Sequence, residues 1–242
     1  DYQLGYILEE FKPDQIAALC DPHMLGALLR YPRSTIQKLH LWTTSDHEVF
    51  PETFRGVMED CATLVFMAEF GRKAWGPHLH RKGPTLMIPH GVDGRIFKPD
   101  PPGTHDAQKR HFGTLDHFVA LHVGFNQWRK QQPLLIEGWA RFVRALPEEH
   151  RARATLYLHT QPTSPPQFVV VGDPDVNRHA ALQAGVNLTR FIDRNHEEEV
   201  RRTIRFSERD IPIEGVSQMY NVADIHVLTS MGEGFGVPLI EA

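Results

Sequence analysis

Cysteine is scarce in this sequence, and long hydrophobic runs are missing. Only two of the 242 residues are cysteines, Cys20 and Cys61, and no Cys-x-x-Cys pair occurs. So few cysteines exclude a disulfide-rich scaffold and are typical of a protein in a reducing compartment. No stretch of eighteen apolar residues is present, and the first residues lack the basic and apolar regions of a signal peptide. We therefore expect a cytoplasmic protein, with peripheral association with a membrane left open.

A strong charge of either sign is also missing. The chain has 26 lysines and arginines against 30 aspartates and glutamates, which gives a net charge of −4 with neutral histidines. So weak a field does not attract polyanions, and we expect no nucleic-acid partner. The Gly-x-Ser-x-Gly turn and the Gly-x₄-Gly-Lys-Ser/Thr loop are absent, so serine hydrolases and P-loop nucleotide triphosphatases lack their residues here.

Histidine is abundant, which raises the question of a metal site. The chain has 15 histidines, and two of them, His78 and His80, are separated by a single residue. No cysteine or carboxylate lies close to this pair in the sequence, and His-Glu-x-x-His is absent. We predict no metal site; a structural zinc at this pair is the alternative.

Glycine and proline are concentrated between residues 89 and 103. A stretch of this composition indicates a linker. The composition, 41% hydrophobic and 23% charged, is that of a soluble globular protein, and the length suffices for one large or two small domains. We predict a first domain over residues 1–90, a linker over 91–104 and a second domain over 105–242.

Segments rich in β-formers alternate with amphipathic segments in both predicted domains. Strands are expected over residues 15–20, 36–43, 62–67, 85–88, 117–123, 154–160, 187–191 and 221–230. Helices are expected over 3–11, 24–31, 52–60, 69–75, 106–112, 132–145, 179–184, 196–202 and 216–222, and no confident assignment covers 161–179. This alternation is typical of an α/β protein with doubly wound parallel sheets. Because a first strand and the end of a last helix are missing, we expect both domains to be incomplete and the chain to be cut from a longer protein.

The last residues combine a glycine-rich turn with the start of a helix. The turn contains Gly232, Gly234 and Gly236, and Pro238 suits the first helical turn. Glycines let a backbone approach a ligand closely, and a helix start presents unpaired N–H groups to an anion or a polyol. The spacing differs from the dinucleotide fingerprint Gly-x-Gly-x-x-Gly and includes Glu233, whose charge would repel a pyrophosphate in direct contact. We therefore expect sugar hydroxyls beside Glu233 and phosphate slightly further away.

A second carboxylate, Glu241, follows Glu233 after seven intervening residues. If the helix begins near Phe235, Glu241 lies about two turns along it, roughly 8 to 10 Å from the turn. Two carboxylates this far apart could contact two parts of one extended ligand. The alternative is a glycine turn that only joins two elements, with Glu241 exposed to solvent.

Two other segments follow predicted strands, where open α/β sheets bind their ligands. Arg129 and Lys130 precede the predicted helix 132–145, where cationic side chains and helix N–H groups can bind a diphosphate. His47, in Ser-Asp-His-Glu, follows the predicted strand 36–43. The alternatives are a solvated pair of charges and an ordinary exposed loop histidine.

The segment Ser-Met-Gly-Glu-Gly-Phe-Gly-Val-Pro-Leu-Ile-Glu-Ala, residues 230–242, resembles the Glu-x₇-Glu signature of the group-1 retaining glycosyltransferases, which have the GT-B fold. Two more segments are similar to that family: Ile-Pro-His-Gly-Val-Asp at 88–93, with Phe97, and His-Val-Gly-Phe-Asn-Gln-Trp-Arg-Lys at 122–130. The resemblance implies an α/β fold of two Rossmann-like domains with doubly wound parallel sheets. The first predicted domain would be the end of the N-terminal, acceptor-side domain, and the second would bind the donor.

The resemblance also implies roles for single residues. It assigns contact with the donor sugar to Glu233 and, by a looser match in position, to His47. It assigns the leaving diphosphate to Lys130 and the ribose hydroxyls to Glu241. The other donor-binding residues that it implies are Gly124, Arg129, Gly234, Phe235, Gly236 and Val237.

The chain departs from the family pattern at Phe125. The family usually has an arginine directly after the glycine of Val-Gly-Arg, whereas Phe125 follows Gly124 here. One phosphate contact is therefore in question, and Arg129 is a candidate to replace it.

The resemblance implies a metal-independent retaining glycosyltransferase that moves a sugar from a nucleotide-activated donor to a hydroxyl acceptor. It requires no cofactor besides the nucleotide sugar, and the acceptor is left open among a saccharide, a lipid-linked saccharide and a small molecule. One alternative is a sugar phosphorylase or a sugar-nucleotide epimerase on the same fold. The other is a module that binds a ligand or partner without chemistry. The chain taken alone is expected to be inactive.

Overall fold

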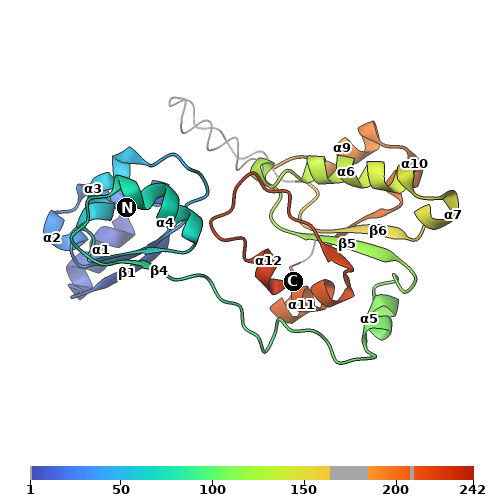
Figure 1. Cartoon of the computed structure of the whole chain (residues 1–242), viewed down its shortest axis with the longest axis horizontal. Helices are drawn as coiled ribbons and strands as arrows, with labels where there is room; N and C mark the ends of the chain where they lie inside the picture. The colour runs from blue at the N-terminus through green and yellow to red at the C-terminus, as the bar shows by residue number, and fades with distance from the viewer. Residues whose placement is uncertain (1, 164–184, 208–209) are drawn as a thin grey trace. The chain divides into compact units, whose positions relative to one another are not determined.

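The computed structural model describes residues 2–163, 185–207 and 210–242 of the chain. The elements follow one another in an alternation of strands and helices along the sequence (Figure 1). Within these three stretches, no helix is both long enough and apolar enough to cross a membrane.

The chain divides into two compact units. The first comprises the residues up to Gly91 together with 232–236, and the second comprises the described residues of 92–231 and 237–242. Each unit contains a four-stranded sheet, and every strand pairing in both sheets is parallel. The predicted α/β class with two parallel sheets is therefore confirmed.

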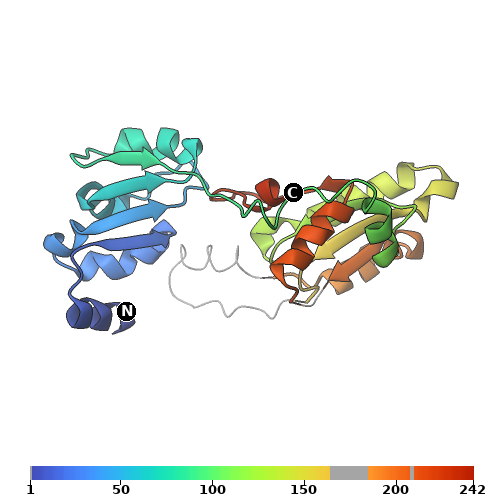
Figure 2. The ribbon, with the colours of Figure 1, turned by 90° about the horizontal axis from the view of Figure 1, so that it is seen from below.

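The sheet of the first unit has the strand order β1-β2-β3-β4. Its strands are β1 (Ile16–Cys20), β2 (Leu39–Thr43), β3 (Thr63–Phe66) and β4 (Thr85–Met87). The helices of this unit are α1 (Tyr2–Phe11), α2 (Arg33–Ile36), α3 (Arg55–Asp60), α4 (Glu69–Trp75) and the 3₁₀ helices η1 (Pro22–Arg30), η2 (Glu52–Phe54) and η3 (Gly76–His78). The register pairs Leu41 of β2 with Ala18 on one side and Leu64 on the other, so β2 and β3 form the middle of the sheet (Figure 2).

The core of the first unit lies where the two middle strands meet α3 and α4. Leu41, Leu64 and Phe66 are fully buried there, together with Met58 of α3 and Trp75 of α4. Burial of large apolar side chains stabilises a fold by roughly 1.5 to 3 kcal/mol each. The ends of β2 and β3 are therefore fixed against α4.

The sheet of the second unit has the order β7-β6-β5-β8. Its strands are β5 (Phe118–Val123), β6 (Ala154–His159), β7 (Ile204–Ser207) and β8 (Ile225–His226). Its helices are α5 (His105–His111), η4 (Trp128–Lys130), α6 (Gln132–Ala145), α7 (Glu148–Arg151), α9 (Leu188–Asn195), α10 (Glu198–Arg201), α11 (Ile213–Val222) and α12 (Pro238–Glu241). On one side of β5 lie β6 and then β7, and on its other side lies β8. The carboxyl ends of β5 and β8 therefore form a topological switch point, where open α/β sheets bind ligands.

Helices cover both faces of this second sheet (Figure 1). On one face, Ile136 and Trp139 of α6 pack with Ile192 of α9 against Leu156 of β6. On the other, Met219 of α11 packs on β5 in a separate cluster. The second unit is therefore doubly wound.

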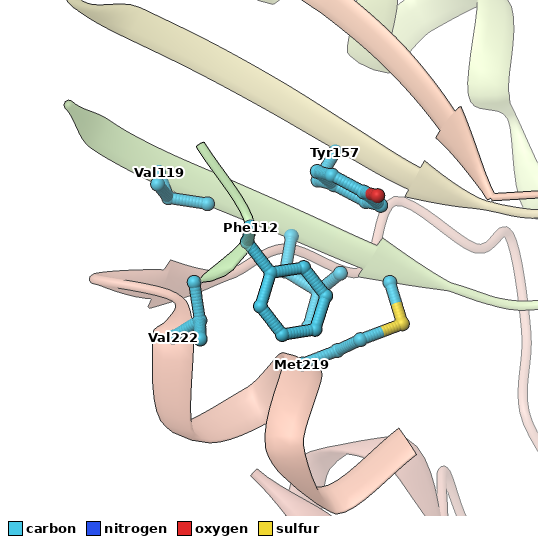
Figure 3. A pocket seen from close by; sticks show the side chains of 6 residues that line it. Phe112, Val119, Tyr157, Met219 and Val222 are labelled. Carbon is cyan, nitrogen blue, oxygen red and sulfur yellow. The ribbon is translucent and has the colours of Figure 1, made fainter. Parts of the chain in front are cut away.

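A small cavity lies between β5 and α11 (Figure 3). It is lined by Phe112, Val119, Leu121, Tyr157, Met219 and Val222. Its volume is about 10 Å³. A water molecule needs at least that much space and two or more polar partners, which this apolar lining does not provide. The cavity is a packing gap in the core and not a ligand site.

The segment before β5 is fixed by a partly buried ion pair, in which the lysine is buried and the aspartate is accessible. Lys109 of α5 donates to both carboxylate oxygens of Asp224, at 2.8 and 2.9 Å, and to the carbonyl oxygen of His117 at 3.0 Å. Asp224 also accepts a hydrogen bond from the backbone N–H of Val119 at 2.7 Å. This carboxylate therefore connects α5, the start of β5 and the residue before β8.

Several sequence predictions are confirmed. The predicted helices 69–75 and 132–145 match α4 and α6 at both ends. Seven of the eight predicted strands have a counterpart, but the strand predicted over 221–230 shrinks to β8, because α11 extends through Val222. The helix predicted over 24–31 is the 3₁₀ helix η1.

One predicted strand is wrong, and one strand was missed. Residues 187–191 begin α9, because the Asn187 side chain caps this helix by accepting the N–H of Arg190 at 2.8 Å. Leu188 and Ile192, four residues apart, then face the core together. The parallel strand beside β6 is instead β7. The predicted helix 179–184 and most of 161–179 lie outside the described residues.

Candidate functional site

The loop after β5 lies at the switch point of the second sheet. Gly124 donates its N–H to the carbonyl oxygen of His159 at 3.3 Å, which continues the pairing with β6. A Cβ at this position would lie 3.4 Å from Nε2 of His122, at ordinary van der Waals distance, so the loop backbone runs directly beside that ring. The next side chain, Phe125, is 79% exposed. Phe125 therefore adds no packing to the loop, and it supplies no positive charge where the family pattern has an arginine.

A buried glutamine braces this loop from the start of α6. Gln132 is fully buried, and its Nε2 donates to the carbonyl oxygen of Phe125 at 3.1 Å. The same group lies 3.3 Å from Nε2 of His122, whose Nδ1 is 2.9 Å from the carbonyl oxygen of Val227. Since Nδ1 must donate to that carbonyl, Nε2 of His122 accepts from the glutamine. Sequence reasoning missed Gln132 and His122, because no local signal marks a buried polar bridge between a strand and a helix.

The two predicted diphosphate residues occupy the short helix η4. Lys130 is 7% exposed and is followed by Gln131, whose backbone is left-handed with φ 53° and ψ 36°. This residue ends η4 and lets α6 start in a new direction. A buried ammonium interacts more strongly with an anion than a solvated one does, because the surrounding dielectric constant is lower. The position of Lys130 suits a phosphate-binding cation.

The turn after η4 is hydrogen-bonded to the segment that follows β8. Met231 donates its N–H to the carbonyl oxygen of Arg129 at 2.8 Å. The hydroxyl of Thr229 donates to the carbonyl oxygen of Lys130 at 3.0 Å and lies 3.3 Å from that of Gln131. The residues leading into the glycine-rich turn are therefore attached directly to the backbone of the predicted diphosphate segment.

Glu241 lies at the end of α12 in the second unit. Its carboxylate oxygen Oε2 accepts a hydrogen bond of 3.1 Å from the hydroxyl of Tyr220 in α11. The predicted place of Pro238 in the first helical turn is confirmed, because α12 begins there. The helix does not start as early as Phe235, since Gly236 has a left-handed φ of 80° that ends the preceding loop. Tyr220 was not identified from the sequence, since a contact between residues on separate helices leaves no spacing signal.

His47 belongs to the loop after β2 in the first unit. Ser45 of this loop is buried, and a Cβ at Gly71 of α4 would lie 1.7 Å from its Oγ, so the loop and α4 are in tight contact. Trp75 of α4 donates its indole N–H to the carbonyl oxygen of His47 at 3.0 Å. The imidazole itself is about half exposed, with Nδ1 2.7 Å from a carboxylate oxygen of Asp46. The carbonyl of His47 is thus held by α4, and its half-exposed ring contacts the Trp75 ring edge-to-face, with centroids 5.5 Å apart.

The glycine-rich turn 232–236 clusters with this same loop in the first unit. A Cβ at Gly232 would lie 2.9 Å from the carbonyl oxygen of Asp46, and one at Gly234 would lie 2.7 Å from Cγ2 of Thr44. Only glycine permits such an approach without displacing a neighbour. The ring of Phe235 also contacts His90, with centroids 5.5 Å apart. The structure therefore places the turn that contains Glu233 against the loop that contains His47, while Lys130, Arg129, Gly124, Val237 and Glu241 belong to the second unit.

Comparison with known proteins gives one curated relative. No family model matches the chain. The sequence is 29% identical over 160 residues to a D-inositol 3-phosphate glycosyltransferase of Geodermatophilus obscurus, which covers 65% of this chain and 30% of that protein. The chain thus spans about a third of the curated relative that it matches.

Solved structures with the same fold cover nearly the whole chain. Anabaena HepE in complex with UDP and glucose superposes with a TM-score of 0.64 at 17% identity, over 99% of this chain and 59% of that one. The UDP-forming α,α-trehalose-phosphate synthase of Burkholderia vietnamiensis gives 0.63 at 12% identity, over 99% and 56%. The predicted GT-B fold is confirmed by these structures. The resemblance to glycosyltransferases is confirmed by the curated relative and the shared fold together.

Proposed function

We propose that this chain acts in a retaining glycosyltransferase and binds a UDP-activated sugar, whose glycosyl group passes to a hydroxyl of a saccharide or another small acceptor. The observation that carries the proposal is a pair of hydrogen bonds, from the Thr229 hydroxyl to the carbonyl oxygen of Lys130 and from the Met231 N–H to that of Arg129. They join the cationic segment after β5 to the start of the glycine-rich turn at the switch point of the sheet, where α/β proteins bind nucleotides.

The reaction needs two kinds of charge stabilisation. As the bond from the anomeric carbon to the diphosphate breaks, positive charge develops on the sugar and negative charge on the leaving group. Lys130 neutralises the diphosphate, with Arg129 beside it in place of the arginine that Phe125 replaces. Glu233 contacts the sugar from the glycine turn, and Glu241 binds the ribose hydroxyls.

The remaining site residues have supporting roles in this proposal. The backbone at Gly124 and through Gly234, Phe235, Gly236 and Val237 lies along the sugar and phosphate. His47 contacts the donor sugar from the loop after β2. These side chains perform the transfer without a metal ion, and the reaction takes place in the cytoplasm.

The names of the similar proteins support the choice of donor. The Anabaena structure contains UDP and glucose, and the Burkholderia enzyme is described as UDP-forming. The curated relative is described as acting with D-inositol 3-phosphate, which supports a polyol or saccharide as the acceptor.

Calorimetric titration of the purified chain with UDP, ADP and GDP tests the nucleotide site, and we expect UDP to bind most tightly. NMR analysis of the product that the full-length enzyme forms from UDP-glucose and a panel of hydroxyl acceptors tests the reaction, and we expect the anomeric configuration of the donor to be retained. Absence of binding to every nucleoside diphosphate would contradict the proposal. Product formed only with inorganic phosphate would indicate a phosphorylase instead.

A further inference from the structure

We propose that Tyr220 is a positioning residue for nucleotide binding: it holds one carboxylate oxygen of Glu241 so that the other faces the ribose hydroxyls of the donor. The inference rests on the proposed function, because it takes Glu241 as the ribose-binding group. It adds a residue that lies outside the motif.

The contact joins two helices of the second unit. Tyr220 lies in α11 and donates its hydroxyl to Oε2 of Glu241 in α12 at 3.1 Å. Within the described residues, no other hydrogen bond to the carboxylate of Glu241 is found. Tyr220 is 7% exposed, whereas Glu241 is only partly buried. The buried hydroxyl of Tyr220 thus holds one oxygen of the more accessible Glu241 carboxylate.

The ring of Tyr220 is held on two sides. Its centroid lies 6.1 Å from that of Phe97 and 5.3 Å from that of His226, and both pairs have edge-to-face geometry. The helix α11, which contains Tyr220, is also attached to the segment before α5, because the hydroxyl of Ser217 donates to the carbonyl oxygen of Ile96 at 2.7 Å. A ring packed in this way gives its hydroxyl one position.

The Tyr220 phenol is suited to act as a hydrogen-bond donor, and the Glu241 carboxylate can accept from two partners. Burial and the adjacent carboxylate of Glu241 raise the pKa of the Tyr220 phenol well above its ordinary value, so the phenol keeps its proton. A carboxylate offers two oxygens with about four lone-pair sites, and Tyr220 uses one of them. The remaining oxygen can accept from the vicinal hydroxyls of a ribose. Because Glu241 stands on a helix of a single turn, a prior hydrogen bond lowers the cost of ordering its side chain on binding.

The test measures how strongly the chain distinguishes a ribose from a ribose without its hydroxyls. Dissociation constants for UDP and for 2′,3′-dideoxy-UDP are measured by calorimetry with the wild type, Tyr220→Phe, Glu241→Gln and the double variant. We expect the wild type to prefer UDP, Glu241→Gln to lose most of this preference, and Tyr220→Phe to reduce it roughly threefold to tenfold. In the Glu241→Gln background, Tyr220→Phe should have little further effect.

Tyr157→Phe is the matched control, because Tyr157 packs in the same core cluster and no hydrogen bond of its hydroxyl is found within the described residues. It should leave the preference for UDP unchanged. An unchanged preference in Tyr220→Phe, whether or not its melting temperature falls, would overturn the inference and leave the proposed function intact. A wild type that binds UDP without any preference over the dideoxy analogue would remove Glu241 from the ribose site. A wild type that binds no nucleoside diphosphate would refute the proposed function itself.

Discussion

The backbone N–H of Met231 donates to the carbonyl oxygen of Arg129 over 2.8 Å. Because Gly232 follows Met231 directly, this bond fixes where the glycine-rich turn leaves the second unit. The buried Lys130 follows Arg129 on the other side of the contact. Met231 directly precedes the predicted sugar-binding turn, and Arg129 directly precedes the predicted phosphate-binding Lys130. One hydrogen bond therefore connects the two predicted binding segments.

Replacement of Lys130 should weaken nucleotide binding more than folding. We expect Lys130→Met to reduce UDP affinity by about 1.5 to 3 kcal/mol, the usual contribution of a charge-assisted hydrogen bond, as measured by calorimetry. Lys73→Met, which removes an exposed lysine from α4, should leave the affinity unchanged. An unchanged affinity in Lys130→Met would shift the diphosphate contact to Arg129.

The two glutamates should affect different kinetic constants. A contact that strengthens as charge develops on the sugar contributes to kcat, whereas a uniform ribose contact contributes mainly to KM. We expect Glu233→Gln to lower kcat by roughly 10² or more in the active full-length enzyme. Glu241→Gln should raise the KM for the donor by about tenfold with a smaller change in kcat. Steady-state rates that show the reverse pattern would contradict both assignments.

Two glycine replacements in the first unit should have opposite signs. A methyl group at Gly71 would lie 1.7 Å from Oγ and 2.8 Å from Cβ of Ser45, so Gly71→Ala should destabilise the chain by about 1 to 3 kcal/mol and displace the loop that contains His47. Gly56 lies in α3 with nothing within 4 Å of the added methyl group, so Gly56→Ala should stabilise by up to about 1 kcal/mol. Urea unfolding measures both changes. Equal effects at the two sites would show that helix propensity alone determines the outcome.

His226 should make stability depend on pH in the mildly acidic range. Burial, with a smaller contribution from His122, lowers its pKa to about 4, and neither ring nitrogen has a hydrogen-bond partner within the described residues. The folded state therefore favours the neutral ring, so this contribution to stability is present above the unfolded pKa of about 6.5 and is lost as pH falls towards 4.

We expect His226 to account for about 1 to 2 kcal/mol of the loss of unfolding free energy between pH 7.5 and 5, after allowance for solvent screening. His226→Phe keeps a ring against Tyr220 and should flatten the pH dependence of urea unfolding. His150→Gln, at an exposed position in α7, should leave it unchanged. If His226→Phe retained the full pH dependence, the loss would have to come from other groups, such as His159, whose pKa burial also lowers.

Where the sequence predicted elements well, one local rule decided the outcome. The helix of α6 follows from apolar residues such as Ile136, Ala140 and Val143 that recur on one face, and its predicted bounds are those of the structure. The short strand β7 and the helix α9 were missed because their local signals conflict. Asn187 is a helix cap only if the following residues turn, and β7 is a strand only because β6 lies beside it.

The sequence by itself determined the α/β alternation and the resemblance carried by residues 230–242, because backbone propensity and motif spacing are properties of neighbouring residues. Only the tertiary structure decided that Met231 bonds to Arg129, that Gly232 lies against Asp46, and that Tyr220 holds Glu241. Each of these three contacts joins residues from separate helices or loops. Each depends on how whole elements pack, and the free energy of that packing is shared among many side chains that no short segment contains.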